Sequence, residues 1–74
     1  MTVRHVTVSA PLTLAEVEVL WLVAEGLTNR EIAVRLSRST PGVDSLCWSL
    51  FRKVGARNRA HVVTRGFELG LLSV

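Results

Sequence analysis

The stretch TNREIAVRLSRSTPGVDSLCWSLFRKV, residues 28–54, carries the start signals of two consecutive helices. The first signal is the pair Thr28 and Glu31, because each side chain can accept a hydrogen bond from the other residue's exposed backbone N–H. This reciprocal pair predicts a short helix over residues 29–36. A short turn follows it, and a longer helix begins directly behind the turn.

The longer helix begins near Pro41, whose missing N–H costs nothing at a first helical position, with Ser39 or Thr40 as its N-cap. Gly55 ends it. One side of this helix is apolar at helical spacing and should be buried, through Val43, Leu46, Cys47, Leu50 and Val54. Three residues point away from that side and need another partner: Asp44, Ser45 and Trp48.

Two further helices flank this pair. Thr13 and Glu16 repeat the reciprocal capping pattern, which predicts a helix that runs to about Glu25. A fourth helix should begin after Asn58 and run to about Leu69. The expected fold is therefore an all-α, four-helix domain.

The chain has 74 residues, which is enough for one small domain. We expect residues 12–74 to form it and residues 1–11 to form an N-terminal arm. Nine basic and six acidic residues give a net charge of +3. Residues 28–59 hold seven basic residues and two acidic ones, a net +5 that coincides with the two central helices and suits a polyanionic partner.

Several classes of protein and site are not expected. A single cysteine, Cys47, excludes an internal disulfide and is typical of a reducing cytosol. The most apolar stretch, VEVLWLVA (residues 17–24), is too short to span a bilayer, and no signal peptide is recognisable, so a soluble cytoplasmic protein is expected. His5 and His61 lack partners at ligand spacing, so no metal and no cofactor are predicted. No carboxylate orients His61 beside a serine, so we do not expect an enzyme.

A short helix, a tight turn and a longer helix form the geometry by which helix-turn-helix proteins place a recognition helix in the major groove of double-stranded DNA. The basic span coincides with these two helices. The same arrangement also occurs in plain helical bundles, so DNA binding and a purely structural role stay open on this pattern alone.

Four segments carry a more specific pattern: LTLAEVEVL (12–20), EGLTNREIAVRLSRST (25–40), FRKVGARNR (51–59) and FELGLL (67–72). Through these segments the chain closely resembles the DNA-binding domain of the LuxR/FixJ/GerE family of bacterial transcription regulators, over nearly everything except the arm. The resemblance implies a four-helix domain whose third helix lies in the major groove and whose fourth helix is of the kind often used for dimerisation.

The resemblance and the positions of the basic residues lead to a first hypothesis, a stand-alone DNA-binding transcription regulator that binds as a homodimer. Phosphate contacts are expected from Thr28, Asn29, Arg38, Thr40, Arg52 and Lys53. Base contacts are expected from Asp44, Ser45 and Trp48. The dimer contact is expected from Val62, Gly66 and Leu69.

The base-reading positions depart from the family pattern. Asp44 stands where the family usually has a lysine, and a carboxylate in the groove is unfavourable unless it accepts a hydrogen bond from a cytosine amino group. Trp48 could lie against a thymine methyl group or could anchor a protein partner. A second hypothesis is therefore a protein-interaction module with little DNA affinity of its own, which engages another regulator through Trp21 or Trp48.

The first helix has apolar residues on two sides. Its core side is expected to carry Val19, Leu20 and Val23. Leu14, Val17 and Trp21 share the opposite side. Either the valines of residues 3–8 or a partner protein would cover that second side.

Overall fold

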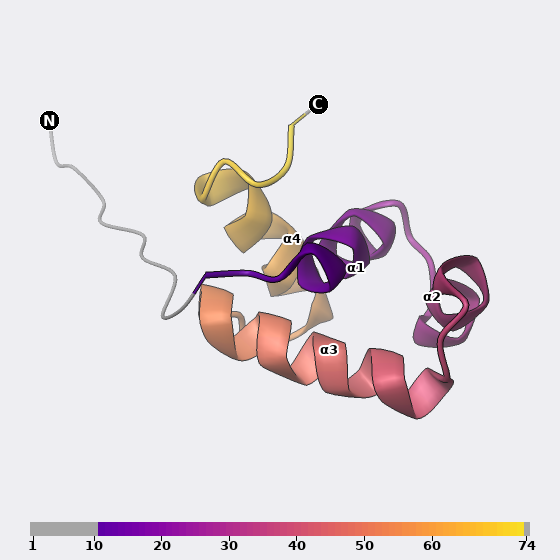
Figure 1. The fold of residues 1–74 in the computed structure, drawn as a ribbon. Helices are drawn as coiled ribbons and strands as arrows, with labels where there is room; N and C mark the ends of the chain where they lie inside the picture. The colour runs from indigo at the N-terminus through magenta and orange to yellow at the C-terminus, as the bar shows by residue number, and fades with distance from the viewer. Residues whose placement is uncertain (1–10, 74) are drawn as a thin grey trace, which may run out of the picture.

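The computed structural model describes residues 11–73, which form four helices and contain no strand (Figure 1). The helices are α1 (Leu14–Ala24), α2 (Asn29–Leu36), α3 (Thr40–Val54) and α4 (Arg59–Glu68). The predicted all-α, four-helix fold is confirmed. Of the predicted N-terminal arm, residues 1–10 lie outside the described part of the chain.

Both reciprocal caps predicted from the sequence are present. At α1 the Glu16 backbone N–H donates to Thr13 Oγ1 at 3.1 Å, and the Thr13 N–H donates to Glu16 Oε1 at 2.7 Å. At α2 the Glu31 N–H donates to Thr28 Oγ1 at 3.2 Å, and the Thr28 N–H donates to Glu31 Oε1 at 2.9 Å. These hydrogen bonds satisfy donors that have no partner inside the helix, so they determine where each helix begins.

The turn between α2 and α3 comprises residues 37–39. Ser37 adopts a left-handed backbone conformation with φ 54°, although no glycine marks the position in the sequence. Ser39 Oγ accepts from the Gly42 N–H at 3.1 Å, so Ser39 and not Thr40 is the N-cap of α3. Gly55, with φ 71°, ends α3 as predicted. The two helices thus follow one another across a short turn, as the helix-turn-helix pattern requires.

The core forms mainly between α1 and α3, each of which packs against the other three helices (Figure 1). The predicted core faces of α1 and α3 are buried, except that Leu46 is only half-buried. The core consists of Val19, Leu20, Leu22, Val23, Ile32, Ala33, Val43, Cys47, Leu50, Val54, Val62 and Leu72. The opposite side of α3 is exposed and does not contribute to the core.

Two of the three residues assigned to a dimer contact are buried inside the domain. Val62 is fully buried, and Gly66 is buried as well. A Cβ atom on Gly66 would lie 2.7 Å from Leu72 Cδ1 and 3.3 Å from Leu20 Cδ1. This corrects the assignment of Val62 and Gly66 to a homodimer surface, because side chains of the same chain already cover them. Leu69 is half-buried, and a dimer through α4 stays a prediction.

Candidate nucleic-acid interface

The side of α3 that points away from the core forms a continuous exposed surface. Asp44, Trp48 and Arg52 follow one another at intervals of four residues, which places them along one line of the helix. We define the outer face of α3 as Asp44, Ser45, Trp48 and Arg52, all of them exposed. The start of α3 and the turn before it add two more exposed polar residues, Arg38 and Thr40.

Trp48 and Arg52 pack on each other at this surface. The central guanidinium carbon of Arg52 lies 4.7 Å from the centroid of the Trp48 ring, which is a cation–π contact, and Trp48 is still 64% exposed. A cation–π contact at an exposed site is worth about 0.5–1 kcal/mol. In this arrangement the Arg52 charge lies beside an apolar ring.

Asp44 is tied to α2 and, through α2, to the start of α4. Asn29 Nδ2 donates to Asp44 Oδ1 at 2.8 Å. Asn29 Oδ1 accepts from Arg59 Nη1 at 2.6 Å, and Arg59 Nη2 donates to the Leu27 carbonyl oxygen at 2.6 Å. The Cys47 thiol also donates to Asn29 Oδ1, at 3.4 Å. We call this set of contacts the Asn29 network; its members are Leu27, Asn29, Asp44, Cys47 and Arg59.

Two residues that were predicted to contact phosphate have partners inside the protein. Both ends of the Asn29 amide are engaged in the Asn29 network. Lys53 Nζ donates to Glu16 Oε1 at 2.8 Å and to the Pro11 carbonyl oxygen at 3.1 Å, and the Lys53 side chain is only 21% exposed. Their assignments as phosphate contacts stay predictions, and these internal bonds compete with such a contact. The remaining four predicted residues are exposed: Thr28, Arg38, Thr40 and Arg52.

Glu16 is a buried carboxylate that joins the start of α1 to α3. Besides its bonds with Thr13 and Lys53, it accepts a hydrogen bond from Ser49 Oγ through Oε2 at 2.6 Å. Burial by itself raises the pKa of Glu16, but the hydrogen bonds from Lys53, Ser49 and Thr13 outweigh burial and lower the pKa to about 2. The carboxylate is therefore charged at neutral pH and holds the Lys53 ammonium against the domain.

Arg59 and Cys47 have roles that the sequence did not indicate. The sequence identifies Arg59 only as one of the residues of the basic span. In the structure its guanidinium connects α4 to Asn29, which lies 30 positions earlier. Burial raises the pKa of the Cys47 thiol, which outweighs the opposing effect of the nearby Arg59 charge. The thiol therefore keeps its proton and can act as a donor to Asn29. No local pattern could have predicted either contact.

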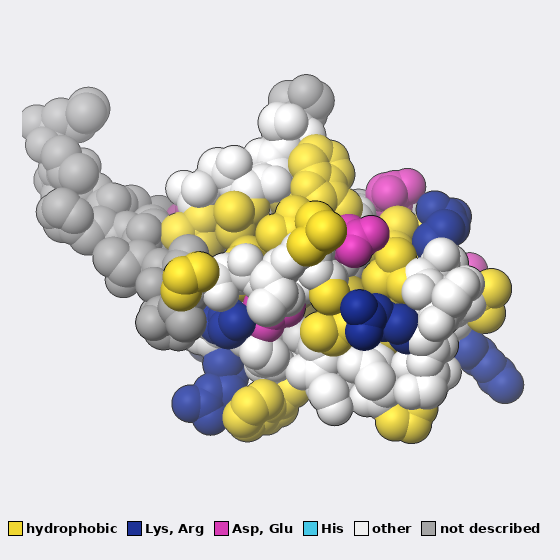
Figure 2. Space-filling model, viewed as in Figure 1, with side chains coloured by type: hydrophobic (Ala, Val, Ile, Leu, Met, Phe, Trp, Pro, Cys, Tyr) yellow, Lys and Arg dark blue, Asp and Glu magenta, His cyan; other side chains and the backbone are white. Residues whose placement is uncertain are grey.

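Other arginines remain available to a ligand. Their side chains make no hydrogen bond or ion pair with any residue between 11 and 73, and they are Arg30, Arg35, Arg38 and Arg57. Figure 2 shows basic side chains over α2 and near the C-terminal end of α3. The predicted basic span thus places exposed positive charge around the helix-turn-helix pair. Lys53 and Arg59 of this span have internal partners, so fewer of its basic side chains are available to a ligand.

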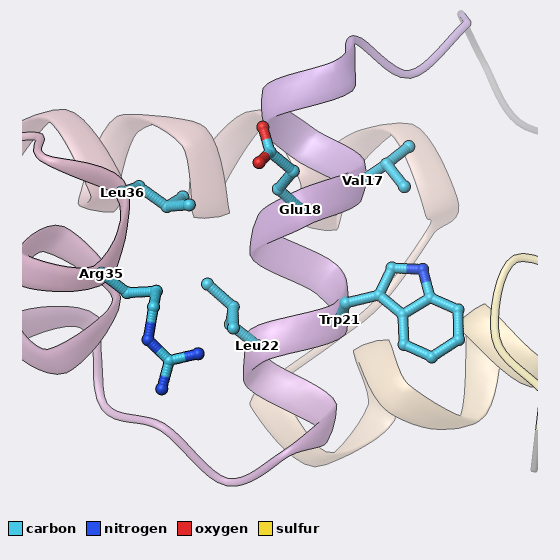
Figure 3. A pocket seen from close by; sticks show the side chains of 6 residues that line it. All are labelled: Val17, Glu18, Trp21, Leu22, Arg35 and Leu36. Carbon is cyan, nitrogen blue, oxygen red and sulfur yellow. The ribbon is translucent and has the colours of Figure 1, made fainter.

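A shallow pocket lies between α1 and α2, and none of its lining residues belongs to α3. Figure 3 shows Leu22 directed from α1 toward α2, while the Trp21 ring points away from α2. Leu14 is 76% exposed and Trp21 is 41% exposed. The valines that were expected to cover this side, within residues 3–8, lie outside the described residues. The pocket is lined by Val17, Glu18, Trp21, Leu22, Arg35 and Leu36.

The part of the chain from residue 11 to residue 73 contains no group of three or more His, Cys, Asp or Glu side chains that could hold a metal ion. It also contains no helix with the length and apolar character needed to cross a bilayer. His61 Nδ1 accepts from the Arg57 backbone N–H at 3.0 Å, so this ring supports the start of α4. His5 lies outside the described residues.

Known proteins resemble this chain in both sequence and structure. The chain is 38% identical over 63 residues to the transcriptional regulatory protein YdfI of Bacillus subtilis (strain 168), and 40% identical over 62 residues to a probable transcriptional regulator of Porphyra purpurea. These alignments cover 85% and 84% of the chain but only 30% of each relative. The chain therefore spans less than a third of the length of these curated relatives.

A solved structure and a family model agree with these relatives. The fold matches the crystal structure of ChrA, a response regulator in a heme-sensing two-component system, with a TM-score of 0.82 and 28% sequence identity. That match covers 85% of this chain and 31% of ChrA. The model of the bacterial regulatory proteins of the luxR family matches residues 10–65. Since the match extends over more than half of the chain and includes the whole helix-turn-helix pair, the chain belongs to the luxR family of bacterial regulatory proteins.

Proposed function

We propose that this chain is a sequence-specific DNA-binding transcription regulator that inserts α3 into the major groove of double-stranded DNA. The observation that carries the proposal is the exposed outer face of α3, beside a turn that presents the unpaired Arg38. A helix is about 10–12 Å across with its side chains, and the major groove is about 12 Å wide. Membership of the luxR family and the relatives named as transcriptional regulators support the same function.

The DNA backbone would be held on both sides of the inserted helix. Arg38 and Thr40 flank the start of α3, Arg52 lies three turns further along it, and Thr28 adds a hydroxyl at the start of α2. Guanidinium groups, hydroxyls and helix N-termini all suit phosphate oxygens. These contacts would set the affinity and the position of α3, but they carry no sequence information.

The bases would be read by the remaining residues of the outer face of α3. The Asp44 carboxylate can only accept hydrogen bonds, so cytosine, which presents an amino group in the major groove, is its best partner. The Ser45 hydroxyl can donate or accept, and the exposed Trp48 ring suits a thymine methyl group. These three residues would give the domain a preference for a DNA sequence of only a few base pairs.

A homodimer would double this short preference, because two-fold pairing reads two half-sites at a fixed spacing. The proposed contact uses the exposed side of α4 and the residues after it, with Leu69 and the 45% exposed Phe67, since Val62 and Gly66 lie in the core. Analytical ultracentrifugation with and without DNA tests the contact. A strict monomer under both conditions, at high protein concentration, would remove the dimer from the proposal.

A gel-shift titration over genomic fragments at several salt concentrations tests the DNA-binding proposal. Binding should favour a subset of fragments and weaken steeply with salt, because phosphate contacts release counterions. Arg52→Ala should flatten the dependence of log K on log salt, while the matched variant Arg35→Ala, which removes a charge from the α1–α2 pocket, should change it less. Binding that ignores both salt and sequence would contradict the proposal.

A second candidate function is protein binding on the same fold. The observation that favours it is the pocket between α1 and α2, beside the exposed Trp21 and Leu14. A pull-down from cell extract with the wild type, Trp21→Ala and Trp48→Ala would test it. Loss of a captured regulator in one variant, with DNA binding unchanged, would support this function. Equal capture by all three proteins would speak against it.

A further inference from the structure

The Asn29 network places a base-reading candidate under the control of two other helices. Asp44 belongs to α3, its hydrogen-bond donor Asn29 to the start of α2, and the next donor, Arg59, to the start of α4. We propose that Asn29, oriented by Arg59, is a positioning residue that holds the Asp44 carboxylate so that it selects cytosine at one step of the DNA site. This inference rests on the proposed function.

The orientation of the Asn29 amide follows from its partners. Arg59 can only donate, so the amide atom that faces it at 2.6 Å has to be the oxygen. The amide nitrogen must then face Asp44, where it donates to Oδ1 at 2.8 Å. Arg59 is itself held, because its Nη2 donates to the Leu27 carbonyl oxygen. The donor directed at Asp44 is therefore determined by the fold and not by a bound ligand.

This arrangement leaves one side of the Asp44 carboxylate for DNA. Asp44 is exposed, and Asn29 engages only Oδ1; within residues 11–73 no donor engages Oδ2. A side chain whose rotamer is already held loses less conformational freedom when it binds DNA. More of its interaction free energy therefore remains to distinguish cytosine from the other bases. The hydrogen bond from Asn29 also offsets part of the cost of bringing a carboxylate close to phosphates.

The chemistry of the base edges gives the preference a direction. Cytosine offers its N4 amino group in the major groove, whereas guanine offers only acceptors, and thymine offers an acceptor and a methyl group. Adenine offers an amino group, but its N7 acceptor lies beside it and would repel the carboxylate. A carboxylate held in one position therefore favours cytosine over all three alternatives.

The test is selection from a randomised DNA library by the wild-type chain and by variants, followed by sequencing of the bound DNA. Asn29→Asp keeps an oxygen for Arg59 but replaces the donor toward Asp44 by a second oxygen, at nearly unchanged shape. The wild type should enrich cytosine at one position of its site, and Asn29→Asp should reduce that enrichment about 3- to 10-fold while preferences elsewhere persist. Asn29→Ala should have the same effect without an added charge.

Two controls separate positioning from a general loss of structure or charge. Arg30→Ala removes an exposed charge from the adjacent position and should lower binding to all sequences about equally. In an Asp44→Ala background, which has already lost the cytosine preference, Asn29→Ala should change the preference no further. Circular dichroism melting of each variant reports whether the fold is kept.

The outcomes distinguish this inference from the function on which it rests. If the wild type binds DNA with a cytosine preference that survives in both folded Asn29 variants, the positioning role is refuted and the DNA-binding function stands. The same holds if Asp44→Ala leaves every base preference intact. If the wild type selects no DNA sequence at all, the proposed function fails and this inference fails with it.

Discussion

Acidification should destabilise the domain through one buried carboxylate, Glu16. Burial raises the pKa of Glu16, but the hydrogen bonds from Lys53, Ser49 and Thr13 bring it from an ordinary 4.5 down to about 2. A carboxyl group whose pKa is lowered by folding stabilises the folded state above its unfolded pKa, and this contribution is lost as the pH falls through the folded pKa. A change of one in pKa corresponds to about 1.4 kcal/mol, so Glu16 contributes about 3 kcal/mol to the free energy of unfolding at neutral pH.

Urea unfolding followed by circular dichroism, repeated from neutral pH down to about pH 2, measures this contribution directly. The free energy of unfolding should be nearly constant above about pH 5 and should fall by about 3 kcal/mol between about pH 4.5 and pH 2. A domain of this size has a total stability of about 4–11 kcal/mol, so the loss would remove a large share of it.

Glu16→Gln supplies the decisive comparison, because glutamine keeps the shape of the side chain but cannot carry its charge. The variant should be about 2–3 kcal/mol less stable at neutral pH, since Lys53 loses its ionic partner, and it should lose most of the acid dependence. Glu18→Gln, an exposed change on the same helix, should keep the wild-type profile. If Glu16→Gln equals the wild type at neutral pH or titrates like it, the ion pair does not hold α1 and α3 together.

Four other substitutions test separate parts of the structure. In DNA titrations, Arg52→Ala should flatten the slope of log K against log salt by about 0.9, whereas Lys53→Ala should leave this slope unchanged. In urea unfolding, Lys53→Ala should lower the free energy of unfolding by about 2 kcal/mol. A flatter slope with unchanged stability in Lys53→Ala would instead make Lys53 a phosphate contact. Asp44→Lys should raise the general affinity for DNA in a binding titration, because it exchanges a repelled charge for an attracted one, and it should relax any preference for cytosine. A lower general affinity would argue against placing this side of α3 near DNA. Gly66→Val should cost about 1–3 kcal/mol in thermal unfolding, because its Cβ would overlap Leu72 Cδ1, and a stability equal to the wild type would mean that this packing is loose.

The helix boundaries could be predicted from the sequence because the signals that set them are local. Thr13 and Glu16 are three residues apart, and so are Thr28 and Glu31, so the same short pattern that predicts each cap also makes its hydrogen bonds. The buried side of α3 could be predicted for a similar reason, since helical spacing alone sorts apolar side chains onto one face.

The internal partners of polar side chains could not be predicted in this way. The Lys53 ammonium suits a carboxylate as well as a phosphate, and its partner Glu16 lies 37 positions earlier, so residue type alone cannot choose between the two. The same ambiguity applies to Asn29. At Gly66 the space beside the backbone is filled by Leu72 and Leu20 of the same chain, a contact that residue type alone does not indicate.

The ion pair between Lys53 and Glu16 also has a mechanical consequence. The same ammonium bonds to the carbonyl oxygen of Pro11, the first described residue, so the entry of the polypeptide into the domain is fastened to the last turn of α3. A displacement of the backbone at Pro11 would therefore reach α1 through the covalent chain and the end of α3 through the Lys53 side chain.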